Sequence, residues 1–261
     1  MAFRTASSLK RQQHHSPAIL KPTEYPGKEL EAMALATNYR RWIMEFFKPF
    51  LGKHILEVGA GAGAFAEMLL RERPQSLTIL EPSDNLYPSL NRRVAALDHD
   101  GIAKVKQATL SEAFGDVSQT PRPDTVVYIN VLEHVEQDEA ELKTICSTLT
   151  PGGRILIFVP AHQFLMSRMD REVGHFRRYS LNELRSKCAS AGFRVMLARY
   201  FDVFGVLPWF VKYRLMKSNR LEPAEVRAYD RCIVPICRTF ESFVSPPFGK
   251  NIILVAERIQ I

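Results

Sequence analysis

Three glycines that follow an acidic residue form the segment of this sequence most suited to binding a ligand. The apolar run of residues 53–58 predicts a buried strand, and it leads from Glu57 into Gly59, Gly61 and Gly63, with Ala60 inside the turn. Because glycine has no Cβ, a ligand can approach the backbone closely where a strand turns into a helix. The spacing therefore predicts a turn that binds a nucleotide-like molecule.

Two kinds of cofactor fit the glycines alone. Gly59, Gly61 and Ala64 satisfy the dinucleotide fingerprint, and Glu81 lies where the ribose-binding acid belongs. A nicotinamide cofactor carries an anionic pyrophosphate, which gains nothing from Glu57. S-adenosylmethionine (SAM) carries a cationic amino group and a sulfonium, which nearby carboxylates stabilise, and Asn130 after the run of residues 125–129 can hold its methionyl end. The residues favour SAM, with a nicotinamide-dependent oxidoreductase as the alternative.

Three segments, taken in order, resemble successive motifs of the class I SAM-dependent methyltransferases and their small-molecule subset. They are residues 55–63 (Ile-Leu-Glu-Val-Gly-Ala-Gly-Ala-Gly), residues 130–134 (Asn-Val-Leu-Glu-His) and residues 149–153 (Leu-Thr-Pro-Gly-Gly). The resemblance implies a Rossmann-like α/β fold, a seven-stranded, mostly parallel sheet with helices on both faces and a reversed last strand. It also implies that SAM is bound by Glu57, Gly59, Ala60, Gly61, Gly63, Glu81, Pro82, Ser83, Asn130, Val131 and Leu132.

One part of the expected cofactor site departs from that family. Many relatives place an acidic residue after the third strand to read the adenine amino group, whereas this chain has Gln107, Ala108, Thr109 and Leu110 there. We therefore expect Thr109 or a backbone carbonyl at Leu110 to make that contact.

Methyl transfer is a displacement at an activated sulfonium, so the protein mainly aligns and desolvates the nucleophile. A base is needed only where the acceptor must lose a proton. His134, just after the fourth strand, and His175, in the loop of residues 174–179, are the candidate bases. Tyr179, which closes that loop, is a further candidate catalytic residue. The alternative for either histidine is a structural role at a helix cap.

The loop of residues 174–179 resembles one that faces the acceptor in a subset of these enzymes. Arg177 and Arg178 could clamp a carboxylate or phosphate there. Alternatively, they pair with Asp170 and Glu172 and fix the loop.

Alternating strands and helices position these residues. Apolar runs at residues 76–80, 125–129 and 154–159 alternate with helical patterns, which predicts a parallel sheet because parallel strands need crossover connections. An amphipathic helix is expected over residues 28–50, a helix over 83–97, and a last strand over 251–256. Residues 1–27 are expected to be a flexible N-terminal arm, and residues 28–261 one methyltransferase domain.

Residues 202–247 are too long for a loop and predict a helical cap inserted before the last strand. Their apolar positions form a helical stripe with a kink near Pro235. The aromatic content of the cap suggests a small, apolar or aromatic acceptor that is methylated on O or N rather than C. The cap is also a candidate for peripheral membrane contact. The alternative is that its apolar and aromatic residues only pack beneath the cap.

Composition narrows the remaining classes. The formal charge is +7, and four of the basic residues lie before position 24, in a segment without acidic residues. The rest of the chain is therefore only mildly basic, which argues against nucleic acid as a partner. An RNA methyltransferase remains an alternative. The four cysteines lack metal or redox spacing, and we expect no metal and a cytoplasmic protein, with organellar import as the alternative. A SAM-binding protein without transferase activity also remains open.

Overall fold

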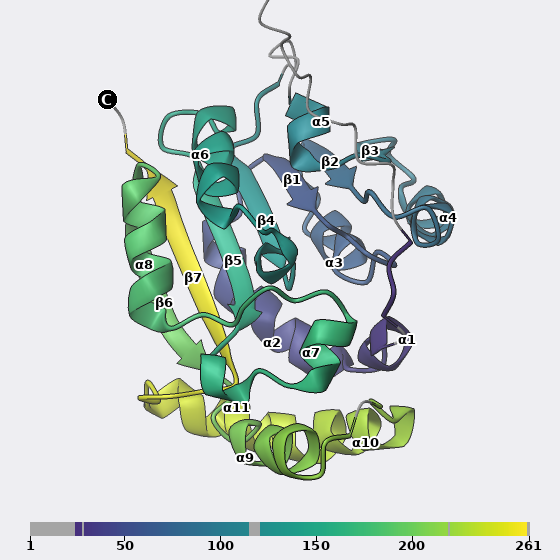
Figure 1. The fold of residues 1–261 in the computed structure, drawn as a ribbon. Helices are drawn as coiled ribbons and strands as arrows, with labels where there is room; N and C mark the ends of the chain where they lie inside the picture. Colours follow the sequence, from purple (N-terminus) through teal and green to yellow (C-terminus); the bar gives the residue numbers. More distant parts are fainter. Residues whose placement is uncertain (1–23, 28, 115–120, 219, 260–261) are drawn as a thin grey trace, which may run out of the picture.

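The computed structural model describes residues 24–27, 29–114, 121–218 and 220–259, and a seven-stranded sheet forms its centre (Figure 1). The strand order is β3-β2-β1-β4-β5-β7-β6; β1 to β5 are parallel, and β7 pairs antiparallel with β5 and β6. This confirms the expected Rossmann-like sheet with a reversed last strand. The strands are β1 His54–Val58, β2 Ser76–Leu80, β3 Ala103–Lys106, β4 Thr125–Ile129, β5 Arg154–Pro160, β6 Phe193–Phe201 and β7 Asn251–Arg258.

Helices cover both faces of the sheet because its central strands are apolar on both sides. Val127 and Leu156 belong to the core with α2, α3 and α4, while Val126 and Ile155 belong to the core with α5, α6 and α8. The bounds are α1 Glu29–Met33, α2 Thr37–Phe47, η1 Lys48–Phe50, α3 Ala66–Arg71, α4 Tyr87–Leu97, α5 Leu110–Phe114, η2 Leu132–His134, α6 Asp138–Thr148, η3 Gln163–Leu165, α7 Arg168–Glu172 and α8 Leu181–Ser190.

The segment between β6 and β7 forms a helical layer below the ends of the parallel strands (Figure 1). Pro235 lies in the first turn of α11, where its missing N–H costs no helical hydrogen bond, and the π-helical turn η5 precedes it. The bounds are α9 Val206–Trp209, η4 Phe210–Leu215, α10 Pro223–Ala228, η5 Tyr229–Ile233 and α11 Val234–Phe243. We call residues 202–250 the cap.

Two of the expected helices differ from the sequence pattern, one by a break and one by a later start. The single helix expected over 28–50 is broken, because Asp230 of the cap accepts the N–H groups of Asn38 and Tyr39, at 3.0 and 2.8 Å, in the first turn of α2. The helix expected from Ser83 begins at Tyr87, since the loop before it wraps around Glu81. Residues 1–23 of the expected N-terminal arm lie outside the described residues.

Candidate active site

The glycine turn bends the chain over the ends of β1 and β2. Gly59, Gly61 and Gly63 have φ values of +68°, +56° and +79°, which residues with a Cβ rarely adopt. The N–H groups of Gly59 and Ala60 donate to the carbonyl of Leu80, at 2.8 and 3.0 Å. The turn is therefore anchored to the neighbouring strand by its backbone.

Glu81, directly after β2, is held against this turn. Its Oε2 accepts the N–H of Gly61 at 2.7 Å, and its Oε1 accepts the N–H of Ser83 at 2.9 Å. Glu81 and Ser83 are buried and Pro82 is half-buried. Each carboxylate oxygen keeps a further lone pair, so Glu81 is fixed in place and can still accept both hydroxyls of a ribose.

Glu57 is a buried acid beneath the same turn. It is only 2% exposed, and its Oε2 has no hydrogen-bond partner among the described residues. Burial, and secondarily the negative charge of Glu81, raises the pKa of Glu57 to about 8. A cationic group at this point would restore its ionised form, which fits the amino group and sulfonium of SAM.

Asn130 follows β4 at the same edge of the sheet. Its φ is +53°, and its N–H donates to the carbonyl of Phe158 at 2.8 Å. A Cβ on Gly59 would lie 2.6 Å from Cγ2 of Val131, so the glycine turn packs directly on this segment. Leu132 is fully buried below it. The structure thus brings the expected ribose and methionyl ends of the site together.

Thr109, expected near the adenine, begins helix α5. Its N–H and hydroxyl both donate to Glu112, at 2.8 and 2.9 Å, and its side chain is exposed. Leu110 is buried in the first turn of that helix. The side-chain hydroxyl is therefore occupied by a helix cap, and an adenine contact would fall to the backbone.

The imidazole rings of His134 and His175 are in contact, although the two residues are 41 positions apart in the sequence. Their centroids are 4.5 Å apart with an interplanar angle of 85°. Burial, and then the proximity of His175, lowers the pKa of His134 to about 3. An imidazole with so low a pKa is neutral at pH 7 and binds a proton only weakly.

Glu133 lies behind the two histidines. It is fully buried, neither carboxylate oxygen has a hydrogen-bond partner among the described residues, and Oε1 is 3.9 Å from Nε2 of His175. Burial raises the pKa of Glu133 to about 7 against the opposing effect of His175. Donor atoms of Glu133, His134 and His175 lie within 4.8 Å of one another, so the group could also hold a metal ion, which the sequence pattern did not indicate.

Asp170 fixes the loop that carries His175. Its Oδ1 accepts from Nδ1 of His175 at 2.9 Å and from Nη2 of Arg178 at 2.7 Å, and Arg178 also reaches the carbonyl of Ala161. Burial opposes ionisation of Asp170, but the hydrogen bond from His175 and the charge of Arg178 outweigh it and lower the pKa. Arg178 thus pairs with Asp170 and fixes the loop.

Tyr179 and Arg177 meet at Asp138 instead. The Tyr179 hydroxyl donates to Oδ2 of Asp138 at 2.8 Å and to the carbonyl of Leu132 at 3.1 Å, and the residue is fully buried. Arg177 lies 2.8 Å from Oδ1 of Asp138 rather than pairing with Glu172. These contacts tie the loop to the segment after β4.

Tyr25 is a site residue that sequence reasoning missed, because it falls in the expected arm. Its backbone exchanges two hydrogen bonds with the side-chain amide of Asn85, each 3.0 Å, and its ring centroid is 6.0 Å from that of His134. Burial, and then the hydrogen-bonded carboxylate of Glu29, raises the pKa of Tyr25, with smaller contributions from Glu133 and Glu81. No local pattern around Tyr25 signals this contact.

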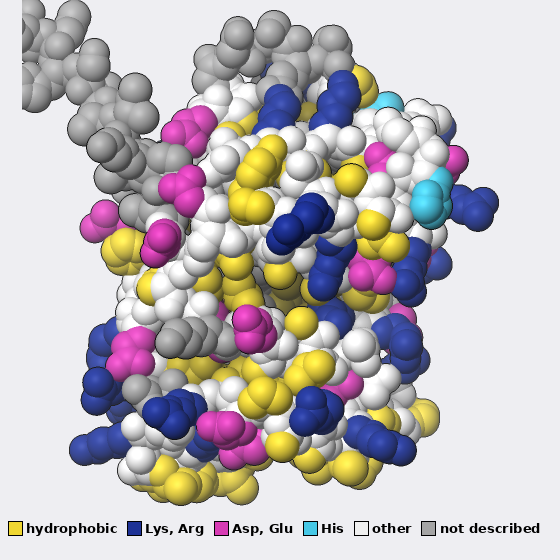
Figure 2. All heavy atoms as spheres, turned by 90° about the vertical axis from the view of Figure 1, so that its right-hand side faces the viewer, with side chains coloured by type: hydrophobic (Ala, Val, Ile, Leu, Met, Phe, Trp, Pro, Cys, Tyr) yellow, Lys and Arg dark blue, Asp and Glu magenta, His cyan; other side chains and the backbone are white. Residues whose placement is uncertain are grey.

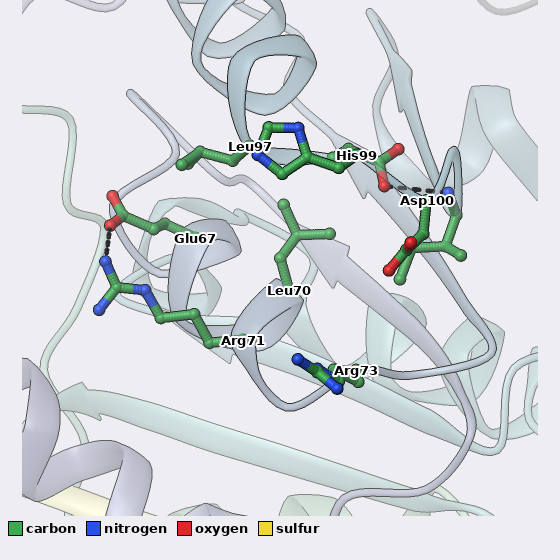
Figure 3. Close-up of a pocket in the computed structure, with 9 residues that line it drawn as sticks. Glu67, Leu70, Arg71, Arg73, Leu97, His99 and Asp100 are labelled. Carbon is green, nitrogen blue, oxygen red and sulfur yellow. Dashed lines mark hydrogen bonds and ion pairs between the residues drawn. The ribbon is translucent and has the colours of Figure 1, made fainter.

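A pocket of about 270 Å³ lies away from these residues (Figure 3). Leu70, Arg71, Leu97 and His99 line it, at the carboxyl ends of α3 and α4. That is the opposite edge of the sheet from the glycine turn. Figure 2 shows a separate hollow with an apolar floor, between the upper part of the molecule and the cap.

Fold and site together define a class I SAM-dependent methyltransferase. The model of the methyltransferase domain family matches residues 32–198, and the chain belongs to this family. Its cofactor is SAM, as the resemblance implied.

Individual relatives are more distant. The ubiquinone biosynthesis O-methyltransferase of Aeromonas salmonicida is 32% identical over 117 residues, 44% of this chain and 47% of that protein. A putative sarcosine dimethylglycine methyltransferase from Galdieria sulphuraria shares the fold with a TM-score of 0.57 at 14% identity, over 85% of both chains. Magnesium protoporphyrin IX methyltransferase from Synechocystis, solved with S-adenosylhomocysteine (SAH), has a TM-score of 0.56 at 11% identity, over 90% of this chain and 95% of that one. The chain spans between 29% and 61% of the length of the curated relatives described by these comparisons.

Proposed function

We propose that this protein transfers the methyl group of SAM to a hydroxyl oxygen of a small, apolar or aromatic acceptor. The observation that carries the proposal is the position of His134, whose imidazole packs against His175 directly after the strand end that holds Asn130. The names of the relatives, O-methyltransferases that match at low identity, support oxygen as the acceptor atom.

SAM supplies a methyl group on a sulfonium that is already activated. Glu81, fixed by the N–H groups of Gly61 and Ser83, would hold the ribose hydroxyls, with Pro82 and Ser83 beside the adenine. Glu57, whose buried Oε2 has no hydrogen-bond partner among the described residues, would face the positive charge of the methionyl end together with Asn130. The glycine turn lets these groups approach the cofactor without a Cβ in the way.

His134 receives the proton of the acceptor hydroxyl as the oxygen attacks. The imidazolium that forms lies beside the carboxyl group of Glu133, which stabilises its charge in a site with little water. His175, held by Asp170, packs edge-to-face against the ring of His134 and fixes its orientation.

Tyr179 acts as a positioning residue in this proposal. Its hydroxyl is committed to Asp138 and Leu132, so it orients the segment that carries His134 without contacting the acceptor. Tyr25 covers the ring of His134 and so helps to exclude water from the base.

The experiment is a transfer assay with methyl-labelled SAM and matched sets of small phenols, alcohols and amines. We expect label to appear in the phenols, and His134→Gln to lower kcat by about a hundredfold, the usual contribution of a general base. SAM affinity should not change in this variant. The matched control is His99→Gln, an exposed histidine at the opposite edge of the sheet, which should leave kcat unaltered. Transfer to amines alone, or full activity of His134→Gln, would overturn the proposal.

A further inference from the structure

Exposed apolar side chains are concentrated on the cap. Of the 15 large hydrophobic residues that are exposed in the described part of the chain, ten lie between positions 204 and 248. They are Phe204, Leu207, Val211, Leu215, Met216, Ile236, Phe240, Phe243, Val244 and Phe248. A contiguous apolar surface of this kind marks an interaction site on a folded protein.

These side chains form two stripes that belong to one surface. Positions 207, 211 and 215 recur every four residues along α9 and η4. Positions 236, 240 and 243 lie three or four residues apart along α11, and Val244 follows directly after that helix. The rings of Phe204 and Phe240 meet at 5.5 Å and join the two stripes. On the opposite side of α11, Cys237 and Glu241 are buried against the body. Figure 1 shows these helices as a single layer at the base of the molecule.

The same surface is basic. Six exposed basic residues of the cap outnumber its two exposed acids, Glu222 and Glu225, while Asp202, Asp230 and Glu241 are buried. The exposed basic residues are Arg214, Lys217, Arg220, Arg227, Arg231 and Arg238. Asp230 caps the first turn of α2, and Glu241 pairs with Arg199 at 3.1 Å. Figure 2 shows apolar side chains along the lower rim, with Lys and Arg above them and some Asp and Glu among these.

We propose that this face of the cap binds the surface of an anionic lipid bilayer. Leucine and phenylalanine side chains, with Lys and Arg around them, are the pattern by which helices lie in the headgroup region of such a bilayer. A second copy of the chain fits less well, since a symmetric contact would oppose the basic residues of one copy to those of the other. No described helix is long and apolar enough to cross a membrane, so the cap lies on the bilayer rather than spanning it.

The docked cap adjoins the candidate active site. Trp209 donates to the carbonyl of Leu165 at 3.2 Å, and its ring lies 4.6 Å from the guanidinium of Arg178, which holds the His175 loop through Asp170. Membrane binding would therefore bring the acceptor side of the site to the lipid. That the lipid supplies the acceptor rests on the proposed function and implies an acceptor that partitions into membranes. The binding of the cap to the bilayer does not depend on the proposed function.

The test is co-sedimentation with phosphatidylcholine vesicles, with and without added phosphatidylglycerol, in the absence of SAM and acceptor. We expect binding only to the anionic vesicles, weakened by salt. The double variant Leu215→Ser with Phe243→Ser, and separately Lys217→Glu with Arg231→Glu, should each lose roughly tenfold in partitioning. The control, Leu97→Ser with Met196→Ser, alters exposed apolar residues outside the cap and should bind as the native chain does.

An unchanged SAM affinity shows that each variant is folded. Equal partitioning of the native chain and both cap variants would overturn the proposal. So would a concentration-dependent dimer, formed without lipid and abolished by Leu215→Ser with Phe243→Ser, because the apolar face would then be a contact between copies. Failure of methyl transfer with normal vesicle binding would count against the proposed function alone.

Discussion

Glu57 and Glu81 are two buried acids that face the glycine turn from neighbouring strands. Glu57 on β1 pairs in register with Ile79 of β2, and Glu81 follows Ile79 by two residues. Burial and the charge of Glu81 raise the pKa of Glu57 to about 8. A proton is thus held near neutral pH at the point where a cationic cofactor group would bind.

SAM affinity should therefore depend on pH through Glu57. The bound cofactor favours ionised Glu57, while the free protein holds its proton up to about pH 8, so binding releases a proton. Between pH 6 and 7.5 the association constant should rise by up to roughly tenfold per pH unit, measured by calorimetry in buffers of different ionisation enthalpy. Glu57→Gln should flatten this dependence; the same slope in the variant would exclude Glu57 as its source.

The stability of the free protein should show the opposite trend. The pKa of Glu57 is higher in the folded chain than its ordinary value of 4.5, so its contribution is complete below pH 4.5 and is lost as pH rises through about 8. Urea unfolding at pH 6 and pH 8 should show Glu57→Gln losing less stability over this interval than the native chain. An identical loss in both proteins would contradict the burial effect.

Glu81→Ala should weaken SAM binding by tenfold or more, because charge-assisted hydrogen bonds to the ribose would be lost. Equilibrium dialysis measures the change. Glu67→Ala removes a half-buried acid from the neighbouring helix α3, where Glu67 pairs with Arg71 at 2.5 Å, and should leave affinity unaltered. Equal SAM affinities of Glu81→Ala and the native protein would show that Glu81 does not bind the ribose.

Asp170→Asn should destabilise the fold by about 3 kcal/mol, since it leaves the buried guanidinium of Arg178 without its carboxylate. The free energy of unfolding in urea at pH 7 is the measurement. Glu172→Gln, on the same helix, breaks only an exposed pair with Arg168 and should cost less than about 0.5 kcal/mol. Similar costs for the two variants would mean that the Asp170 pair does not hold the loop.

The arrangement of the residues proposed to bind the cofactor could be predicted from the sequence because it depends on local pattern. Glu57, the glycines, Glu81 and Asn130 each follow or end a strand, and the carboxyl ends of parallel strands meet at one edge. In the observed strand order β2, β1 and β4 are neighbours, so the ends of these strands lie side by side.

The contacts that sequence reasoning missed join distant segments without a local signal. Arg177 was expected to clamp a ligand or pair with Asp170 or Glu172, yet it pairs with Asp138, which also accepts from Tyr179 and Lys187. The side chain that divides the first helix, Asp230, comes from the cap nearly 200 residues later. Pairings of this kind are decided by tertiary packing, which neither periodicity nor capping residues encode.

Transfer of the methyl group itself is the most direct test. The purified chain is incubated with methyl-labelled SAM and a small phenol that partitions into lipid, and mass spectrometry follows both products. We predict one labelled methyl ether for each SAH formed, and about a hundredfold less of both with His134→Gln. Tight binding of SAM with neither SAH nor labelled product, across hydroxyl and amine acceptors, would show that the chain binds the cofactor without transferring its methyl group.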